Sequence, residues 1–307
     1  MELSFVPARL GEMPRLIALL AAVFVASGCS GAPPGPPSSP PATSSANPAT
    51  PSAPATSSLY LRAWLTQALP PPAGFARGPL LTVSDGVLVD FNVAVPAIFP
   101  GPLLILPNGR SITDAGETAL IEEARRLGLL SGAGDLTGGG LVPGAEAAQL
   151  VMVVDGVTYE LTGDPARPIE CDGRRCSAQP GTPDAFTAYW RLLADTSWLE
   201  PQLGSQQTYI PERLAVLIGP VAEPEAGIEP NRVAWPLETS LAEFGQPFAG
   251  REWERCGVGG GDEQAALLNV LRKSNQLTVF IDDAGNARSL MARPLVPGEP
   301  SPCAQSA

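Results

Sequence analysis

The chain has 307 residues, of which 44% are hydrophobic, and its 31 acidic and 19 basic side chains give a net charge of −12 at neutral pH. This composition is typical of a globular protein, and the acidic balance argues against nucleic acid as a partner, because phosphates attract Lys and Arg. Histidine is absent, which excludes Ser-His-Asp and Cys-His catalysis and the paired histidines of metalloproteases.

The first element in chain order is a secretory signal. Arg15 precedes an unbroken apolar run over residues 16–25, and three small residues lead from it to Cys29. This three-part order is typical of a signal peptide. The apolar run is about half as long as the roughly 20 residues that a membrane-spanning helix needs. We therefore predict a signal peptide over residues 1–28.

Translation could start at either of two methionines, Met1 or Met13. Glu2 and Glu12 place negative charge where such signals are usually positive, and Met13 stands shortly before the apolar run. A start at Met13 gives a shorter and more ordinary signal than a start at Met1.

The sequence Val-Ala-Ser-Gly-Cys that ends at Cys29 resembles the lipobox of bacterial lipoproteins, with Ala26 where leucine is commonest. The resemblance implies that the Cys29 thiol takes up a diacylglycerol, that cleavage follows Gly28, and that the new amino terminus is then acylated, for example with palmitate. Stable anchoring requires more than one acyl chain. We therefore expect a lipoprotein held to the bilayer through Cys29, on the extracytoplasmic face.

A linker is predicted to follow the lipidated cysteine, so that residues 29–58 form a tether. The segment is rich in Pro, Ser, Thr and Ala and carries no charged side chain. It has too little apolar surface to fold. It is interpreted as a spacer, with an O-glycosylated stalk as the alternative, and the ectodomain is predicted over residues 59–307.

The four remaining cysteines are predicted to form two disulfides, as an even number in an oxidising compartment suggests. Cys171 and Cys176 flank an Asp-Gly turn, so a local bridge closes easily. By elimination, Cys256 pairs with Cys303 and ties the carboxy-terminal tail to the rest of the domain. A four-cysteine zinc site is the alternative, but the spacings do not fit a zinc ribbon.

The ectodomain is predicted to be α+β, with antiparallel hairpins and a few amphipathic helices. Asp-Gly pairs predict hairpins at 80–89 and 150–161, and a third is predicted over 277–292. Helices are predicted after Ser58, Thr113 and Thr182 and from Asp262, with a single helical turn over 241–244. The remaining predictions are extended segments at 93–99 and 103–106, a turn at Asn108-Gly109, strands at 214–218 and 233–235, a subdivision near 220–232, and two similar halves.

No catalytic, cofactor-binding or metal-binding residue is assigned. The glycine run 259–261 before Asp262 lacks the Lys-Ser/Thr of a phosphate loop and is interpreted as a flexible connector. Acidic residues at predicted turns fit local hydrogen bonding better than catalysis; these are Asp85, Asp155, Asp172, Asp282 and Asp283. The tryptophans are interpreted as core residues.

Four short stretches are similar to recurring blocks of a group of uncharacterised predicted lipoproteins from high-GC bacteria. They are Ala-Trp-Pro-Leu at 234–237, Arg-Cys-Gly-Val at 255–258, Ser-Asn-Gln-Leu-Thr at 274–278 and Leu-Val-Pro-Gly-Glu at 295–299. The resemblance implies an envelope location and disulfides, and it implies no activity.

The function that the sequence favours is a binding or structural role, with an envelope protein, peptidoglycan or a small ligand as partner. The alternative is a histidine-free hydrolase that uses paired carboxylates; an inhibitor or accessory subunit is a third class. A hydrolase should gather two carboxylates in one cleft, with the pKa of at least one raised. A binding module should expose an apolar patch on its acidic surface.

Overall fold

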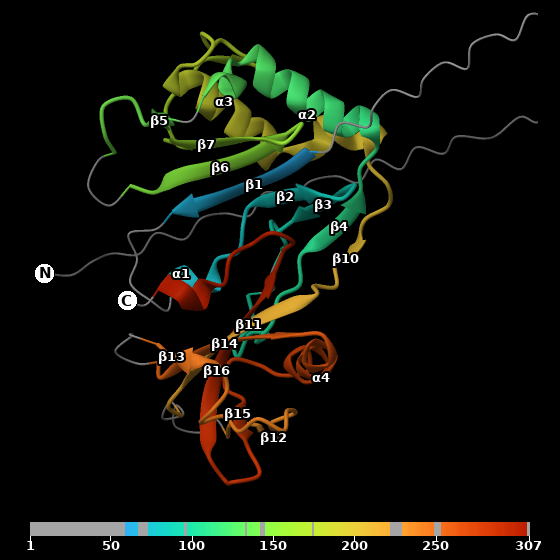
Figure 1. Ribbon diagram of the computed structural model, residues 1–307, viewed down its shortest axis with the longest axis vertical. Helices are drawn as coiled ribbons and strands as arrows, with labels where there is room; N and C mark the ends of the chain where they lie inside the picture. Colours follow the sequence, from blue (N-terminus) through green and yellow to red (C-terminus); the bar gives the residue numbers. More distant parts are fainter. Residues whose placement is uncertain are drawn as a thin grey trace, which may run out of the picture. The chain divides into compact units, whose positions relative to one another are not determined.

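The computed structural model describes residues 59–66, 73–94, 97–132, 134–141, 145–173, 175–221, 229–248 and 253–305. The predicted signal peptide, Cys29 and the linker lie outside these residues. All of these described residues belong to one compact unit. This unit is α+β, as predicted, and contains two mixed β-sheets and four α-helices within its described part (Figure 1).

Eight of the described strands form the first sheet, and neighbours are antiparallel except for β5 and β7. Their order is β10 (Gln207–Thr208), β4 (Asn108–Ser111), β3 (Val87–Asp90), β2 (Leu81–Ser84), β1 (Leu59–Thr66), β6 (Ala147–Val154), β7 (Val157–Gly163) and β5 (Gly134–Leu136). The two predicted Asp-Gly hairpins are confirmed as β2–β3 and β6–β7. Asp85 and Asp155 both have φ of 51°, which a two-residue hairpin turn requires.

Two helices cover one face of the first sheet (Figure 1): α2 (Asp114–Arg126) and α3 (Pro183–Ala194). Both begin where predicted, because the Thr113 and Thr182 side chains accept hydrogen bonds from the backbone N–H groups of Gly116 and Ala185. Two 3₁₀ segments follow them, η1 (Leu129–Ser131) and η2 (Thr196–Gln202). The buried side chains of α2, α3 and β1 share one core.

The helix predicted after Ser58 is wrong, because this segment is the central strand β1. Leu59, Leu61 and Ala63 are buried while the residues between them are partly exposed, which is the period of a strand. The strand pairs with β2 on one side and β6 on the other. The spacing of Leu61 and Leu65 fits both a helix and a strand. The segment forms a strand because it pairs with a neighbouring strand on each edge.

Six described strands form the second sheet, in the order β12 (Arg232–Ala234), β15 (Val279–Ile281), β16 (Ala287–Leu295), β11 (Arg213–Gly219), β14 (Arg255–Gly260) and β13 (Gln246–Pro247). Neighbours are antiparallel except for β12 and β15. The strands predicted at 214–218 and 233–235 and the hairpin predicted over 277–292 are confirmed. The predicted turn at 241–244 is present, since two backbone N–H groups bond the Ser240 carbonyl.

Helix α4 (Asp262–Leu271) packs on the second sheet. The flexible connector predicted before it is wrong, because Gly259 and Gly260 belong to β14. A side chain at Gly259 would collide with Leu267 of α4. Glycine here therefore leaves room for the Leu267 side chain between helix and sheet. The N-cap is Gly261, in a left-handed conformation at φ 56°, and not Asp262.

Two further predictions between β3 and β4 are wrong. The described residues of 93–99 and 103–106 form no strand, and Pro102 makes an isolated bridge to Asn275. Prolines remove the donors that a ladder needs. Asn108-Gly109 begins β4 and is not a turn, because it pairs with β3 and β10.

Segments that connect strands of the first sheet pack against both faces of the second sheet, and the chain after β16 reaches β1. Leu103 and Leu104, between β3 and β4, lie in the core under the second sheet. Phe75 of α1 (Ala73–Ala76) packs on its opposite face. Past β16, a Cβ on Gly298 would lie 2.9 Å from the Tyr60 ring of β1. The sheets differ in strand number and order, so the predicted similarity of two halves is not confirmed.

Candidate functional site: an apolar cavity along strand β16

A cavity of about 1160 Å³ follows β16 from Ser289 to Pro294. Its position is a consequence of unequal strand lengths. β15 pairs with β16 only from Ala287 to Ser289, whereas β16 continues to Leu295. The part of the cavity that follows β16 past the first residue of β15 is also lined by residues 76–80 and 91–93 and by Pro102, Leu103 and Ile105.

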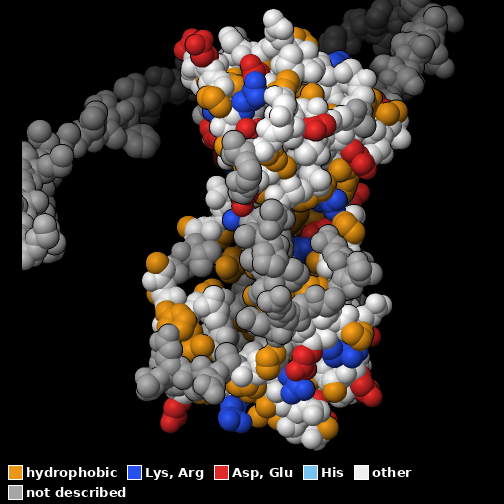
Figure 2. Space-filling model, turned by 90° about the vertical axis from the view of Figure 1, so that its left-hand side faces the viewer, with side chains coloured by type: hydrophobic (Ala, Val, Ile, Leu, Met, Phe, Trp, Pro, Cys, Tyr) orange, Lys and Arg blue, Asp and Glu red, His pale blue; other side chains and the backbone are white. Residues whose placement is uncertain are grey.

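The cavity wall is mainly apolar. It includes Leu65, Leu80, Phe91, Leu103, Ile105, Trp253, Leu290 and Met291. Several hydrophobic side chains of the described residues are visible at the surface near the middle of the face that Figure 2 shows. The lining is that of a small-molecule site, since such pockets are mostly apolar with a few polar groups, and the volume is somewhat above their usual range of about 300–1,000 Å³.

One polar pair in the lining is an ion pair between Arg77 and Glu146. The Arg77 Nη1 lies 2.6 Å from the Glu146 Oε1, and the two side chains are 48% and 38% exposed. The pair connects the chain after α1 with the chain before β6. At this exposure, its contribution to stability is on the order of 1 kcal/mol or less.

The third charged side chain in the described lining is that of Arg293, which is only 7% exposed. Its Nη2 lies 2.8 Å from the Glu299 Oε1, and its guanidinium is 5.8 Å from the centre of the Phe75 ring. The other carboxylate oxygen of Glu299 accepts a hydrogen bond from the Val296 N–H. The ion pair is thus buried and has a hydrogen-bonded carboxylate, which is what a charge needs inside a protein.

Two donors in this wall have no protein partner. The Nε of Arg293 and the Nε1 of Trp253 are buried, and neither donates a hydrogen bond to an acceptor among the described residues. An unsatisfied buried donor costs about 1–3 kcal/mol of desolvation, and such an atom calls for a partner such as water or a ligand. Both atoms are donors, and both residues line the cavity.

The carboxylates expected of a hydrolase are not gathered here. Of the described residues that line the cavity, Glu146 alone carries a carboxylate. Burial raises the pKa of Glu117, but this side chain accepts hydrogen bonds from the backbone of Leu59 and Gly86 and is not part of the cavity lining. Glu117 therefore connects α2 to the first sheet.

The acidic residues singled out in the sequence lie in turns. Asp85, Asp155 and Asp172 are exposed at hairpin ends. Asp282 is buried and accepts hydrogen bonds from the N–H groups of Leu241 and Asn286, at 3.0 and 2.8 Å. Bonds from the Asn286 side chain and these backbone groups lower the pKa of Asp282. Within the described part of the chain, no group of three or more His, Cys, Asp or Glu side chains could hold a metal ion.

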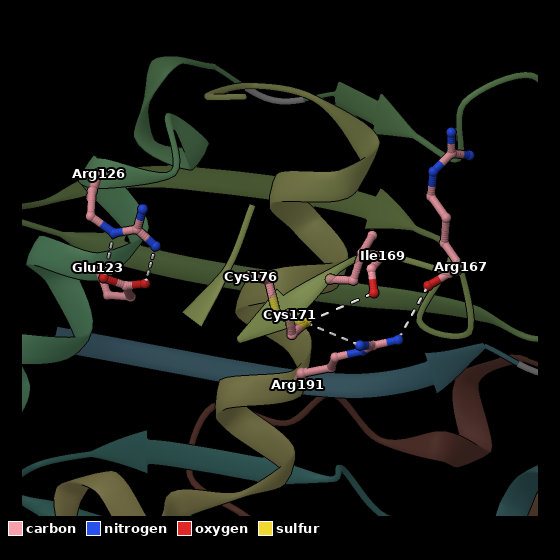
Figure 3. The surroundings of a disulfide bond; sticks show 7 residues. All are labelled: Glu123, Arg126, Arg167, Ile169, Cys171, Cys176 and Arg191. Atoms are coloured by element: carbon pink, nitrogen blue, oxygen red, sulfur yellow. Dashed lines mark hydrogen bonds and ion pairs between the residues drawn. A yellow bond between two sulfur atoms is a disulfide. The ribbon is translucent and has the colours of Figure 1, made fainter. Parts of the chain in front are cut away.

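Both predicted disulfides are confirmed, and their cysteines are not zinc ligands. Cys171–Cys176 joins the two short strands β8 (Cys171–Asp172) and β9 (Arg175–Cys176). The Arg191 guanidinium of α3 lies 3.3 Å from the Cys171 sulfur (Figure 3). Cys256–Cys303 joins β14 to η3 (Pro302–Gln305).

Sequence reasoning missed the cavity and the two donors in its wall. The tryptophans were expected in the core, as Trp190 and Trp235 are, whereas Trp253 is partly buried and lines the cavity. Arg293 stands alone in the apolar stretch 290–296, and this is the one signal in the sequence that points to it.

Comparison with known proteins gives no match to a family model, a curated protein or a solved structure. No helix among the described residues has the length and hydrophobicity that crossing a bilayer requires.

Proposed function

We propose that the chain is a lipid-anchored lipoprotein of the bacterial envelope whose ectodomain binds an apolar ligand in the cavity along β16. The observation that carries the proposal is the cavity itself, with its volume of about 1160 Å³ and its apolar wall. Two disulfides support an extracytoplasmic location, because such bonds persist in oxidising compartments.

Binding is favoured over hydrolysis by the distribution of polar groups. A two-carboxylate mechanism needs an acid and a base on opposite sides of one cleft, and the described lining supplies the single carboxylate Glu146. The exposed apolar side chains of Ile98 and Phe99, 62% and 61% accessible, are the kind of surface expected of a binding module.

The anchor is tested by the variant Cys29→Ser in cells. We expect the parent protein to sediment with membranes, because an acylated cysteine holds it there, and the variant to appear in the soluble extracytoplasmic fraction. Cys29 is the proposed lipidation site, so Ser30→Ala serves as the control and should stay with the membrane. Equal sedimentation of parent and Cys29→Ser protein would contradict the lipid anchor.

Ligand binding is tested by thermal unfolding of the full chain with hexadecanol, a neutral long-chain probe. A ligand at 100 times its dissociation constant adds about 2.7 kcal/mol to the free energy of unfolding, so the melting temperature should rise. The variant Ala76→Trp places a large side chain at the cavity lining and should reduce the rise in melting temperature. The control is Ala115→Trp, because Ala115 is exposed on α2 and lies outside the lining. The control variant should show the same rise as the parent protein. No rise in the parent protein, or an equal rise in both variants, would overturn the proposal.

A further inference from the structure

We propose that the Cys171–Cys176 disulfide is a thiol-exchange site, at which a partner that carries two thiols reduces the bond and Cys171 leaves as a thiolate beside Arg191. The proposal is independent of the cavity and of its ligand. It begins from a difference between the two disulfides. Cys256 is only 1% exposed and belongs to an apolar core cluster, whereas Cys171 is exposed at the surface.

The exposed disulfide lies on a small hairpin of its own. In the described chain, β8 and β9 form a separate two-stranded sheet in which Cys171 faces Cys176. One further backbone hydrogen bond, from the Ser177 N–H to the Glu170 carbonyl, extends the hairpin. Cys176 packs against the edge of the first core, and Cys171 is not among the residues of that core. Opening the bond therefore loosens a surface hairpin and leaves the two large sheets paired.

Arg191 holds a positive charge against one of the two sulfurs. Its Nη1 lies 3.3 Å from the Cys171 Sγ, and its Nη2 lies 3.5 Å from the Arg167 carbonyl oxygen, so the guanidinium is directed across the sulfur from helix α3 (Figure 3). Among the described residues, Arg191 belongs to no ion pair, whereas Arg167 is paired with Asp184. A disulfide sulfur is neutral and a weak acceptor, so the contact becomes stronger when the sulfur is an anion.

The other charges around the bond nearly balance one another. Glu170 and Asp172 flank the first cysteine and oppose a thiolate there, while two arginines directly precede the second cysteine. The Glu123 and Arg126 side chains, also drawn in Figure 3, are bonded to each other. Arg191 is therefore the excess positive charge beside Cys171. A positive and partly exposed environment of this kind is typical of reactive cysteines.

The exchange takes place in two displacement steps. A thiolate of the partner attacks the Cys176 Sγ and forms a mixed disulfide, and the Cys171–Cys176 bond breaks with its electron pair on the Cys171 Sγ, beside Arg191. The second thiol of the partner loses its proton and attacks the partner sulfur of the mixed disulfide. Cys176 leaves as a thiolate and takes up that proton. The partner dithiol is oxidised to a disulfide by two electrons, and the protein disulfide is reduced. The sulfur that leaves fastest is the one whose anion is best stabilised, and this is Cys171.

The test is equilibration of the full chain in buffers of reduced and oxidised glutathione, followed by trapping of free thiols with iodoacetamide and peptide mapping. Glutathione buffers reduce labile disulfides and leave structural ones oxidised. We expect label on Cys171 and Cys176, while Cys256 and Cys303 stay joined in the same sample. A Cys171–Cys176 bond that stays oxidised, or that is reduced only together with the buried bond, overturns the proposal.

The role of Arg191 is tested by Arg191→Gln at two pH values. At pH 9, the variant should need about a tenfold more reducing glutathione buffer for half-reduction, or about 30 mV for this two-electron couple. This is at the lower end of what a hydrogen bond to a charged group supplies, because Arg191 is exposed. At pH 6 the difference should vanish, because free cysteine has a pKa of about 8.5 and both sulfurs are then thiols. The carboxylates and arginines nearby keep their charges at both pH values.

The control is Arg272→Gln, which removes an exposed arginine next to α4. It should titrate with glutathione as the parent protein does at both pH values. A shift for Arg191→Gln that is equal at pH 6 and pH 9, or that Arg272→Gln reproduces, would mean that the thiolate is not stabilised by Arg191. No shift at pH 9 would have the same meaning. The cavity and its ligand are unaffected by any of these results.

Discussion

Replacement of Cys256 and Cys303 by serine is expected to lower the free energy of unfolding by about 4 kcal/mol, the chain-entropy value for a loop of this length. The two cysteines are 47 residues apart in sequence, and the loop between them contains α4, β15 and β16. Without the bond, the unfolded chain gains the freedom that this loop had lost. Urea unfolding of parent and variant proteins measures the difference.

The second disulfide provides the matched control. Cys171 and Cys176 are five residues apart, so the same relation gives about 2 kcal/mol for Cys171→Ser with Cys176→Ser. The prediction is that the Cys256/Cys303 variant loses more stability than the Cys171/Cys176 variant. Equal losses would mean that loop length does not determine the effect. No loss in either variant would mean that the cysteines are free in the protein.

The parts of the fold that could be predicted from the sequence are those determined by residues close together in the chain. Thr113 and Thr182 predict the starts of α2 and α3 because a threonine N-cap acts within its own turn. The Asp-Gly pairs at 85–86 and 155–156 predict hairpins because positive φ is needed at both positions. The pairing of Cys171 with Cys176 likewise follows from a short loop.

The parts that do not follow depend on contacts between distant segments. β1 is a strand because it pairs with residues 81–83 and 147–154, and Gly259 lies where the Leu267 side chain of α4 packs against the strand. The cavity depends on distant contacts even more, since its wall combines Leu65, residues 76–80 and residues 289–294. No local pattern indicates that these segments meet, so neither the cavity nor the place of Trp253 in its wall could be predicted.

Among the single substitutions proposed for β16, Arg293→Met is expected to lower the free energy of unfolding most, because it breaks the ion pair with Glu299. Arg293→Met leaves the Glu299 carboxylate buried, at 9% exposure, without its cation. Removal of one partner of a buried pair costs about 3–5 kcal/mol. Replacement of both by methionine leaves no charge behind, so Arg293→Met with Glu299→Met should cost much less than the single change. Urea unfolding of both single variants and the double variant completes the cycle.

The same strand supplies an exposed pair as the control. Arg288 and Glu254 lie 3.0 Å apart, with side chains 29% and 47% exposed, so Arg288→Met should cost about 1 kcal/mol or less. A loss for Arg293→Met as small as this would contradict the burial of the pair. A double variant as unstable as Arg293→Met would show that packing around the guanidinium stem, and not its charge, stabilises this wall of the cavity. Recovery in the double variant would mean that the single substitution is costly because it leaves the Glu299 carboxylate buried without its cation.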